Sequence, residues 1–388
     1  MTSRPLVVYA DGPDGPLPDP RSVAAVRELA DPELLLGWVV RTPVWLDEVG
    51  LPVTTVLAGS GLREAVRAGR VRHVPRRLSA MPALLRGGLR PDVAVVGAVA
   101  EAGGWRSIAS VGWAPAAARA AREVVIEQWT APPAAEVPIP PAPAIEGNIV
   151  EVLLRADPPD PPQAVVVGER ERRIAAAVAG LVPDGATLQW GPGALGAAVV
   201  AALSRPVRVH AGVVTDELVG LAERGILAGP AVAAYLWGGP GLARLAAAGG
   251  VRLESVEQIH DPARLAAIPR FVAVNTALEV GLDGAANVEG PRDRPVSGPG
   301  GHPDFCLGAS RSPGGLSVVV VRAEVAGRSA IVARPAVVST PRTDVDVVVT
   351  EHGVADLRGR TDAERAASLI AVAGPAHRAS LRAAATGG

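Results

Sequence analysis

A glycine loop directly ahead of polar side chains is the part of this sequence best suited to bind a ligand. Gly298, Gly300 and Gly301 precede His302 and Asp304 in the segment PVSGPGGHPDF. Glycines at this spacing let a backbone approach a ligand closely and direct its N–H groups toward it. We therefore predict that this loop lines a ligand site.

A second glycine pattern, GPGALG at residues 191–196, lies between a predicted strand and a predicted helix. It has the form of the dinucleotide-binding fingerprint, which would indicate a nicotinamide-dependent oxidoreductase. Such a unit needs an acid at the end of the next strand to bind the ribose. The next predicted strand, Val207–His210, is followed by no acid before Asp216. Nicotinamide binding stays the weaker alternative, and a tight strand-to-helix turn explains the glycines as well.

Three longer stretches resemble the acetyl-CoA hydrolase / 4-hydroxybutyrate CoA-transferase family. The family carries N-[ST]-A-L-E-V-D-L-x-G and then G-x-G-G-x-x-D-F, and this chain has NTALEV at 275–280 and GPGGHPDF at 298–305. The family segment V-D-x-V-V-T-E-x-G-x-A-D-L-R-G is matched by VDVVVTEHGVADLRG at 345–359. The resemblance covers residues 180–388 well and 50–130 loosely.

The resemblance implies a glutamate nucleophile that attacks an acyl-CoA thioester and then exchanges its acyl group for CoA. The family places this glutamate in H-[TS]-E-[MV]-x-x-D, and this chain has HAGVVTD at 210–216. The glutamate position is Gly212. Glycine cannot be acylated, so we expect transfer by this covalent route to be impaired or absent.

Four residues are candidates for the remaining chemistry. Glu351 matches a family glutamate that assists the nucleophile, and it could act as a general base on water; a partnered core carboxylate is the alternative. Gly301 matches the glycine whose N–H holds the thioester oxygen. His260 occupies a family position held by Asn or His, although it could instead cap the helix predicted over Pro262–Ala267. Asp216 is a further carboxylate, for which helix capping is the alternative.

The resemblance also implies contacts with the acyl group and with CoA. Backbone in the GPGALG turn would line the acyl pocket, and Arg328, two residues from the position of a family lysine, could supply charge to a phosphate. The complete set of binding candidates is Gly191, Gly193, Leu195, Asn275, Gly298, Gly300 and Arg328. Cys306 is interpreted as a core thiol. The six histidines lack metal-ligand spacing, so we expect no metal and no permanently bound cofactor.

Alternation of strands and helices predicts the framework that positions these residues. Strands over Phe271–Asn275 and Val345–Thr350 are among the clearest, and helices are expected over Glu169–Leu181 and Asp362–Ala373. The pattern indicates an α/β fold of two open, mainly parallel-sheet domains, and the resemblance implies that these domains are CoA-transferase-like. We expect them at 1–160 and 161–388, with the active site in the cleft between them at the carboxyl ends of strands. A proline-dense segment at 131–163 is interpreted as a connector or a surface excursion.

Composition restricts the classes of function. The 38 basic residues are all arginine, which excludes Schiff-base lysines and a Walker-A lysine, and the formal net charge is −1. We expect neither a nucleic-acid nor a membrane partner, because no basic domain and no apolar run of spanning length is present. The beginning of the sequence lacks the pattern of a signal peptide, so a cytoplasmic location is expected.

These observations predict an acyl-CoA hydrolase or CoA-transferase for a short acyl thioester. Coenzyme A or acyl-CoA would be its substrate, a carboxylate its second substrate, and a homodimer its assembly. A degenerate homologue that binds acyl-CoA without turnover is the alternative, and a nicotinamide-dependent oxidoreductase is the third.

Overall fold

A computed structural model describes residues 4–9, 11–13, 18–26, 28–129, 141–155 and 165–386 of the chain. The chain groups into two compact units. Unit 1 consists of Met1–Pro162, Val232–Ile259 and Pro295–Gly300, and unit 2 consists of Gln163–Ala231, His260–Arg294 and Gly301–Gly388. Two later segments thus join the first unit. A single domain boundary near residue 160 stays a prediction.

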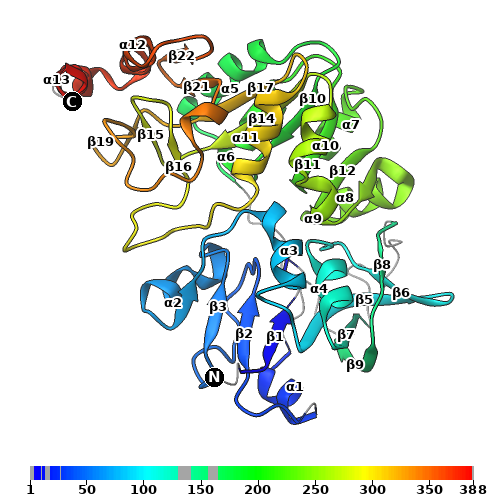
Figure 1. The fold of residues 1–388 in the computed structure, drawn as a ribbon. Helices are drawn as coiled ribbons and strands as arrows, with labels where there is room; N and C mark the ends of the chain where they lie inside the picture. Colours follow the sequence, from blue (N-terminus) through cyan, green and yellow to red (C-terminus); the bar gives the residue numbers. More distant parts are fainter. Residues whose placement is uncertain are drawn as a thin grey trace. The chain divides into compact units, whose positions relative to one another are not determined.

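Unit 1 contains a nine-stranded sheet with a parallel core (Figure 1). Its path runs β4-β3-β2-β1-β5, and β7 and β9 continue from β5 in parallel. β6 and β8 add an antiparallel branch beside β5. The strands are β1 (Leu6–Tyr9), β2 (Glu33–Leu36), β3 (Val53–Thr55), β4 (Val71–His73), β5 (Val93–Glu101), β6 (Gly104–Ser107), β7 (Glu123–Trp129), β8 (Ala144–Ile145) and β9 (Ile149–Arg155).

Short helices and two further strands complete unit 1. The helices are α1 (Pro20–Val26), η1 (Ser60–Leu62), α2 (Arg63–Arg67), η2 (Leu78–Ala80), α3 (Met81–Arg86), α4 (Ala114–Ala120), α8 (Pro240–Leu245), η3 (Ala246–Gly250) and α9 (Val256–Ile259). The strands are β12 (Ala231–Leu236), whose residues from Val232 belong to this unit, and β13 (Val251–Leu253).

The proline-dense segment contains more structure than a connector needs. β9 lies inside it and pairs with β7, which extends the parallel sheet by one strand. Its side chains are partly exposed, and Leu154 is 72% exposed, so the strand lacks the apolar pattern of a buried one. The proline-rich runs at 131–140 and 156–163 lie outside the described residues, so their predicted role as extended connectors is not tested.

Unit 2 contains the other mainly parallel sheet, in the order β11-β10-β14-β17-β21-β22. The pairs from β11 to β21 are parallel, and β22 closes an antiparallel edge. Its strands are β10 (Thr187–Trp190), β11 (Arg208–Val214), β14 (Phe271–Thr276), β17 (Leu316–Val320), β21 (Val347–Thr350) and β22 (Gly353–Asp356). β17 and β21 are buried along their whole length, as apolar strands between helical layers should be.

The helices of unit 2 cover this sheet, and α11 crosses β14 and β17 in Figure 1. α10 packs on α11, whereas α5 packs on α6 and on β21. The helices are α5 (Glu169–Leu181), α6 (Ala194–Ala202), α7 (Glu217–Glu223), α10 (Pro262–Ala267), α11 (His302–Arg311), η4 (Arg342–Asp344), α12 (Asp362–Val372), η5 (Pro375–His377) and α13 (Arg378–Thr386). No helix in the described ranges is long and apolar enough to cross a membrane.

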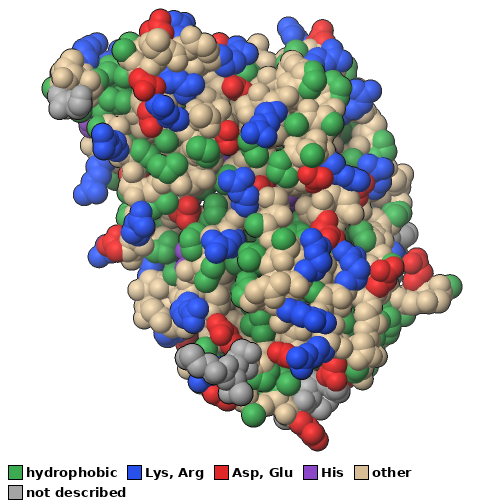
Figure 2. Space-filling model, in the orientation of Figure 1, with side chains coloured by type: hydrophobic (Ala, Val, Ile, Leu, Met, Phe, Trp, Pro, Cys, Tyr) green, Lys and Arg blue, Asp and Glu red, His purple; other side chains and the backbone are tan. Residues whose placement is uncertain are grey.

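Two small sheets adjoin the main sheet of unit 2. β15 (Glu279–Gly281) pairs with β16 (Ala286–Asn287) and β20 (Ile331–Val332). β18 (Glu324–Val325) and β19 (Arg328–Ser329) form a hairpin. Arginine and acidic side chains are interspersed over the face of the molecule that Figure 2 shows.

Candidate functional site

Three of the candidate positions meet in unit 2, near the carboxyl ends of its parallel strands. Gly212 lies near the end of β11, His260 directly precedes the turn into α10, and Gly301 is the residue before α11. The carboxyl edge of a parallel sheet is the usual place for a ligand. The sequence separates these residues widely, and the strand order and the packing of α10 on α11 bring them together.

His260 lies against both glycines. Its ring packs on the ring of Phe305, with centroids 4.6 Å apart. A Cβ on Gly301 would lie 2.6 Å from His260 Nδ1 and closer still to Cε1, so this position must be glycine while the imidazole stays in place. Gly301 has φ −90°, and steric approach rather than backbone conformation therefore explains the glycine. A Cβ on Gly212 would lie 3.4 Å from His260 Nε2, which is ordinary contact.

The imidazole of His260 is buried and lacks hydrogen bonds. The side chain is 1% exposed, and neither ring nitrogen has a hydrogen-bond partner among the described residues. The carboxylate of Asp304 lies 3.8 Å from Nδ1, too far for a hydrogen bond. Burial and, to a smaller extent, the charge of His210 together lower the pKa of His260 to about 3. The ring is therefore neutral near pH 7 and offers one N–H donor and one acceptor.

The beginning of α11 adds the electrostatics of a helix N-terminus. The first N–H groups of a helix have no acceptor within it, and they carry partial positive charge. Gly301 is the N-cap residue of this ten-residue helix and, as a glycine, has no side chain that could accept from its first N–H groups. His260 and these amides together favour a polarised carbonyl oxygen or an anion.

A second buried histidine, His302, follows Gly301. Its Nδ1 is 2.8 Å from Thr340 Oγ1 and 3.6 Å from the sulfur of Cys306, and its Nε2 is buried without a partner. Burial lowers the pKa of His302 to about 4 and raises the pKa of the Cys306 thiol to about 12. The interpretation of Cys306 as a core thiol is confirmed.

The alternative that His260 caps α10 is wrong. Asp261 provides that cap, because the Ala263 N–H donates to its Oδ1 at 2.9 Å. Asp216 directly precedes α7, but its side chain makes no capping hydrogen bond, and it is exposed. Capping therefore does not account for Asp216, and its role in chemistry stays a prediction.

The GPGALG turn is a tight strand-to-helix connection. Gly193 has φ 109°, which favours glycine, and a Cβ on Gly196 would overlap the carbonyl oxygen of Gly191. A Cβ on Gly191 or Gly193 would meet nothing within 4 Å, so their backbone is open to a ligand. Leu195 is buried in α6. The turn geometry explains Gly193 and Gly196 without a nucleotide.

Asn275 is occupied by a partner that the sequence did not reveal. Its Nδ2 donates to Gln189 Oε1 at 2.9 Å, and Gln189 Nε2 donates back at 3.2 Å. This reciprocal amide pair joins β14 to β10 and is buried. A contact of Asn275 with CoA stays a prediction. The indole N–H of Trp190, at the end of β10, is buried and has no hydrogen-bond partner in the described part of the chain, and no sequence motif marks this residue.

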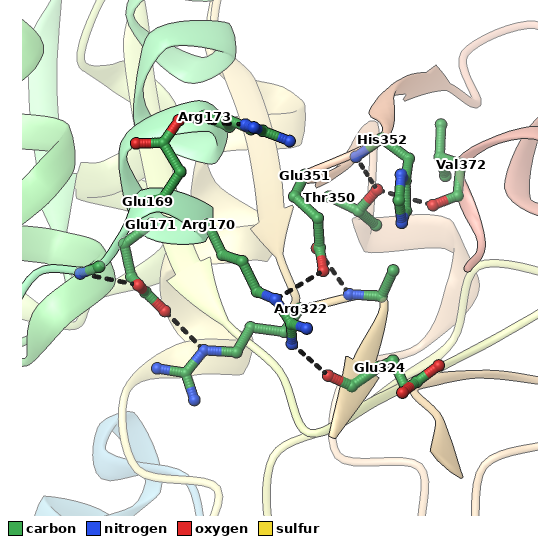
Figure 3. Close-up of polar contacts among 12 residues, drawn as sticks. Glu169, Arg170, Glu171, Arg173, Arg322, Glu324, Thr350, Glu351, His352 and Val372 are labelled. Carbon is green, nitrogen blue, oxygen red and sulfur yellow. Dashed lines mark hydrogen bonds and ion pairs between the residues drawn. The ribbon is translucent and has the colours of Figure 1, made fainter. Parts of the chain in front are cut away.

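Glu351 follows β21 at the same edge of the sheet, but its carboxylate is held by other groups (Figure 3). The Ala323 N–H donates to its Oε2 at 2.8 Å, and Arg170 Nε lies 3.9 Å from its Oε1. The side chain is 7% exposed. No described contact joins it to His260 or Gly301. These contacts fit the alternative of a partnered carboxylate, and the predicted role as a base is not tested.

The beginning of α5 and the first residue of β18, Glu324, belong to the same network of contacts as Glu351. Arg322 Nε donates to Glu171 Oε1 at 2.7 Å, while Glu171 Oε2 accepts the Gly168 N–H and so caps α5. Arg170 also donates to the Glu324 carbonyl oxygen (Figure 3). The network therefore ties the beginning of α5 to the segment after β17.

The remaining binding candidates are Gly298, Gly300 and Arg328. Gly298 and Gly300 belong to unit 1, where the Gly300 carbonyl oxygen accepts the Leu78 N–H at 3.0 Å. A Cβ on Gly298 would overlap the carbonyl oxygen of Val56. Arg328 is exposed in the β18–β19 hairpin. Their contacts with CoA stay predictions.

Among the described residues, no group of three or more His, Cys, Asp or Glu side chains could hold a metal ion.

Comparison with known proteins shows what this fold and sequence resemble. A family model described as the acetyl-CoA hydrolase/transferase C-terminal domain matches residues 243–385. The succinyl-CoA:cyclohexane-1-carboxylate CoA transferase of Geobacter metallireducens is 31% identical over 349 residues, which cover 82% of this chain and 76% of that protein. The 4-hydroxybutyrate coenzyme A transferase of Clostridium kluyveri is 31% identical over 245 residues, or 59% of this chain. The matched region spans 56% of the length of the latter protein.

Solved structures share the fold over nearly the whole chain. A 4-hydroxybutyrate CoA-transferase from Porphyromonas gingivalis has a TM-score of 0.75 and 25% identity, covering 98% of this chain and 92% of that chain. RipA from Yersinia pestis has a TM-score of 0.84 and 24% identity, covering 100% and 94%. The predicted α/β, mainly parallel, CoA-transferase-like fold is confirmed. The chain belongs to the acetyl-CoA hydrolase/CoA-transferase family of enzymes.

Proposed function

We propose that this protein transfers CoA from a short acyl thioester to a carboxylate, with the chemistry in unit 2 beside His260. One observation supports this most directly: a buried, neutral imidazole with unpaired nitrogens lies between Gly212 and Gly301, at the beginning of α11. The relatives named above, CoA transferases, support the same reaction class.

The beginning of α11 would bind the thioester carbonyl oxygen. As a nucleophile attacks, negative charge grows on that oxygen, and the Gly301 N–H and the helix N-terminus stabilise it. His260 would donate a hydrogen bond from one ring nitrogen. Loss of one such donor typically lowers the rate about 100- to 1000-fold.

Transfer is favoured over hydrolysis because His260 is a poor base. A base works best when its pKa is near the working pH, and the pKa of His260 is about 3. Water must lose a proton when it attacks, whereas a carboxylate is already an anion. Glu351, the candidate base, accepts the Ala323 N–H instead. A carboxylate therefore suits this site better as the attacking group.

Gly212 favours a second candidate, a protein that binds acyl-CoA without turnover, because the family nucleophile is absent at this position. An assay separates the two. The purified full chain is incubated with a panel of short acyl-CoA thioesters, each with and without an added carboxylate, and the products are identified by mass spectrometry. Formation of the CoA thioester of the added acid supports transfer, and bound but unchanged acyl-CoA supports the binding protein.

We further propose a cytoplasmic homodimer of a two-domain chain, and Arg328 as a contact for a CoA phosphate. CoA and acyl-CoA would be substrates and not permanent cofactors. Light scattering of the purified chain tests the dimer. The affinity of Arg328→Ala for CoA and for dephospho-CoA tests the phosphate contact.

A further inference from the structure

The backbone at Gly212 has no conformational need for glycine. The residue is buried near the end of β11, and it is absent from the glycines with positive φ. A Cβ there would only touch His260 and Phe305, at 3.4 Å. Glycine in a strand costs about 0.5–1 kcal/mol relative to alanine, and it often marks a place where a ligand comes close. No side chain at position 212 packs on this face of His260, whose imidazole is nevertheless buried.

The buried imidazole of His260 needs a hydrogen-bond partner. Nε2 is the ring nitrogen nearest to the Cβ position of Gly212, while Nδ1 faces Asp304 and Gly301. Buried polar atoms are nearly always hydrogen-bonded, so an unpaired buried side chain points to a ligand or a water. A hydrogen-bond acceptor that carries negative charge would be stabilised by the neutral N–H of His260 and by the partial positive charge at the beginning of α11.

We propose that the carboxylate of the acyl acceptor occupies the place beside Gly212, against His260, and attacks the thioester directly. This inference rests on the proposed function and adds the position of the acceptor and the order of events. The ligand class is a short, unbranched monocarboxylate, because Phe305 and the strand backbone bound the position next to His260.

The reaction balances without a covalent enzyme intermediate. A carboxylate oxygen forms a bond to the thioester carbon, the C–S bond breaks, and the electron pair leaves on sulfur as CoA thiolate. This gives a free mixed anhydride. The thiolate then forms a C–S bond to the acceptor's carbonyl carbon, the anhydride C–O bond breaks, and the first acyl group leaves as a carboxylate. No net proton transfer and no redox change is required.

Both substrates must then be bound at once. Initial rates at varied acyl-CoA and varied propionate should give intersecting double-reciprocal lines, whereas a covalent enzyme intermediate would give parallel ones. Propionate labelled with ¹⁸O at both oxygens should deliver one ¹⁸O to the released acid within a single turnover. The bridging oxygen of the anhydride comes from propionate and leaves with the first acyl group. This transfer of ¹⁸O is the signature of direct attack by propionate.

Gly212→Ala tests the position of the acceptor. The added methyl would lie in van der Waals contact with His260, where we place the carboxylate. One misplaced methyl in a fitted site typically changes the discrimination between substrates by about 10-fold or more. We expect the KM for propionate to rise about 10-fold and the KM for acyl-CoA to change little. Gly220→Ala, in α7, is the matched control, because a Cβ there meets nothing within 4 Å. It should leave both values unchanged.

A binding measurement separates this inference from the proposed function. ¹⁵N-histidine NMR, with the His260 signal assigned by its loss in His260→Gln, reports carboxylate binding without turnover. If no acyl-CoA is consumed, the proposed function fails, and a propionate-induced shift of the His260 signal that weakens in Gly212→Ala still supports the acceptor site. Three results would overturn the inference: parallel double-reciprocal lines during turnover, release of the first acid without ¹⁸O, or no shift of the His260 signal when propionate is added.

Discussion

Gly301→Ala is the substitution that tests the arrangement of His260 most sharply. The new Cβ would lie 2.6 Å from His260 Nδ1, within the distance that real Cβ atoms do not adopt. His260 is 1% exposed and packs on Phe305, so its ring has little room to move away. Overpacking of this kind costs about 1–3 kcal/mol in the free energy of unfolding. We also expect thioester turnover to fall at least about 100-fold, because the Gly301 N–H must shift.

The same clash should vanish when the imidazole is removed. In a His260→Ala background, the nearest remaining side-chain atom to the new Cβ is Phe305 Cε2 at 3.1 Å, which requires only a small adjustment. Gly301→Ala should then cost a few tenths of a kcal/mol, so the two substitutions should couple by about 1–3 kcal/mol, whereas independent sites add within about 0.5 kcal/mol. Hydrogen exchange of peptides that cover α11 and β14 reads the stability of unit 2 on its own. Equal costs of Gly301→Ala in both backgrounds would refute the placement of His260 over Gly301.

Three further predictions concern the carboxylates of Glu351 and Asp11 and the glycine at position 212 in β11. Glu351→Gln should leave transfer to propionate within about threefold, because Glu351 accepts the Ala323 N–H and no described contact joins it to His260; a fall of about 100-fold, as loss of a general base gives, would show that transfer needs this carboxylate. Burial raises the pKa of Asp11 from 3.8 to about 6, so the free energy of unfolding of unit 1 should fall as pH rises from about 4 to 6, by about 3 kcal/mol. Asp11→Asn should remove this slope in denaturant titrations at pH 4, 5 and 6, and a slope that persists would assign it to another group. Gly212→Glu should produce a CoA adduct on that peptide after incubation with acyl-CoA, since the Cβ fits without overlap, and no adduct in a folded variant would show that the surroundings have diverged further.

Local patterns predicted most of the elements that carry the site. The strand predicted over Phe271–Asn275 is β14, at the centre of the sheet of unit 2. The helix predicted over Asp362–Ala373 is α12, which begins at a capping box between Thr361 and Glu364. Such elements follow from apolar runs and cap residues that are close in the sequence. The expected elements therefore differ from the structure mainly at their ends.

Other features depend on contacts that no local pattern contains. β4 lies in an arginine-rich stretch, RVRHVPRR at residues 70–77, and its register with β3 brings it into the sheet. The pairing of Asn275 with Gln189 requires the alignment of β14 with β10. Likewise, Glu351 stands at the expected edge, but the Ala323 N–H that holds it comes from the segment after β17. The side chain's type and position were predictable, and its partners were not.

The motifs singled out His260, Gly301 and Gly212 one at a time, and their proximity is the new fact. It follows from the strand order around β10 and from the packing of α10 on α11. The unpaired nitrogens of His260 were equally invisible in the sequence, because they depend on Asp304 lying 3.8 Å away and on Asp261 providing the cap of α10.

Mass spectrometry of the intact protein, quenched during turnover of acetyl-CoA in the presence of propionate, tests the central claim most directly. We predict that propionyl-CoA accumulates over many turnovers while the protein keeps its unmodified mass, because Gly212 offers no carboxylate to acylate. An acyl or CoA adduct that forms and decays at the rate of turnover would contradict direct transfer. A folded protein that leaves acetyl-CoA unconsumed would contradict the transferase activity itself.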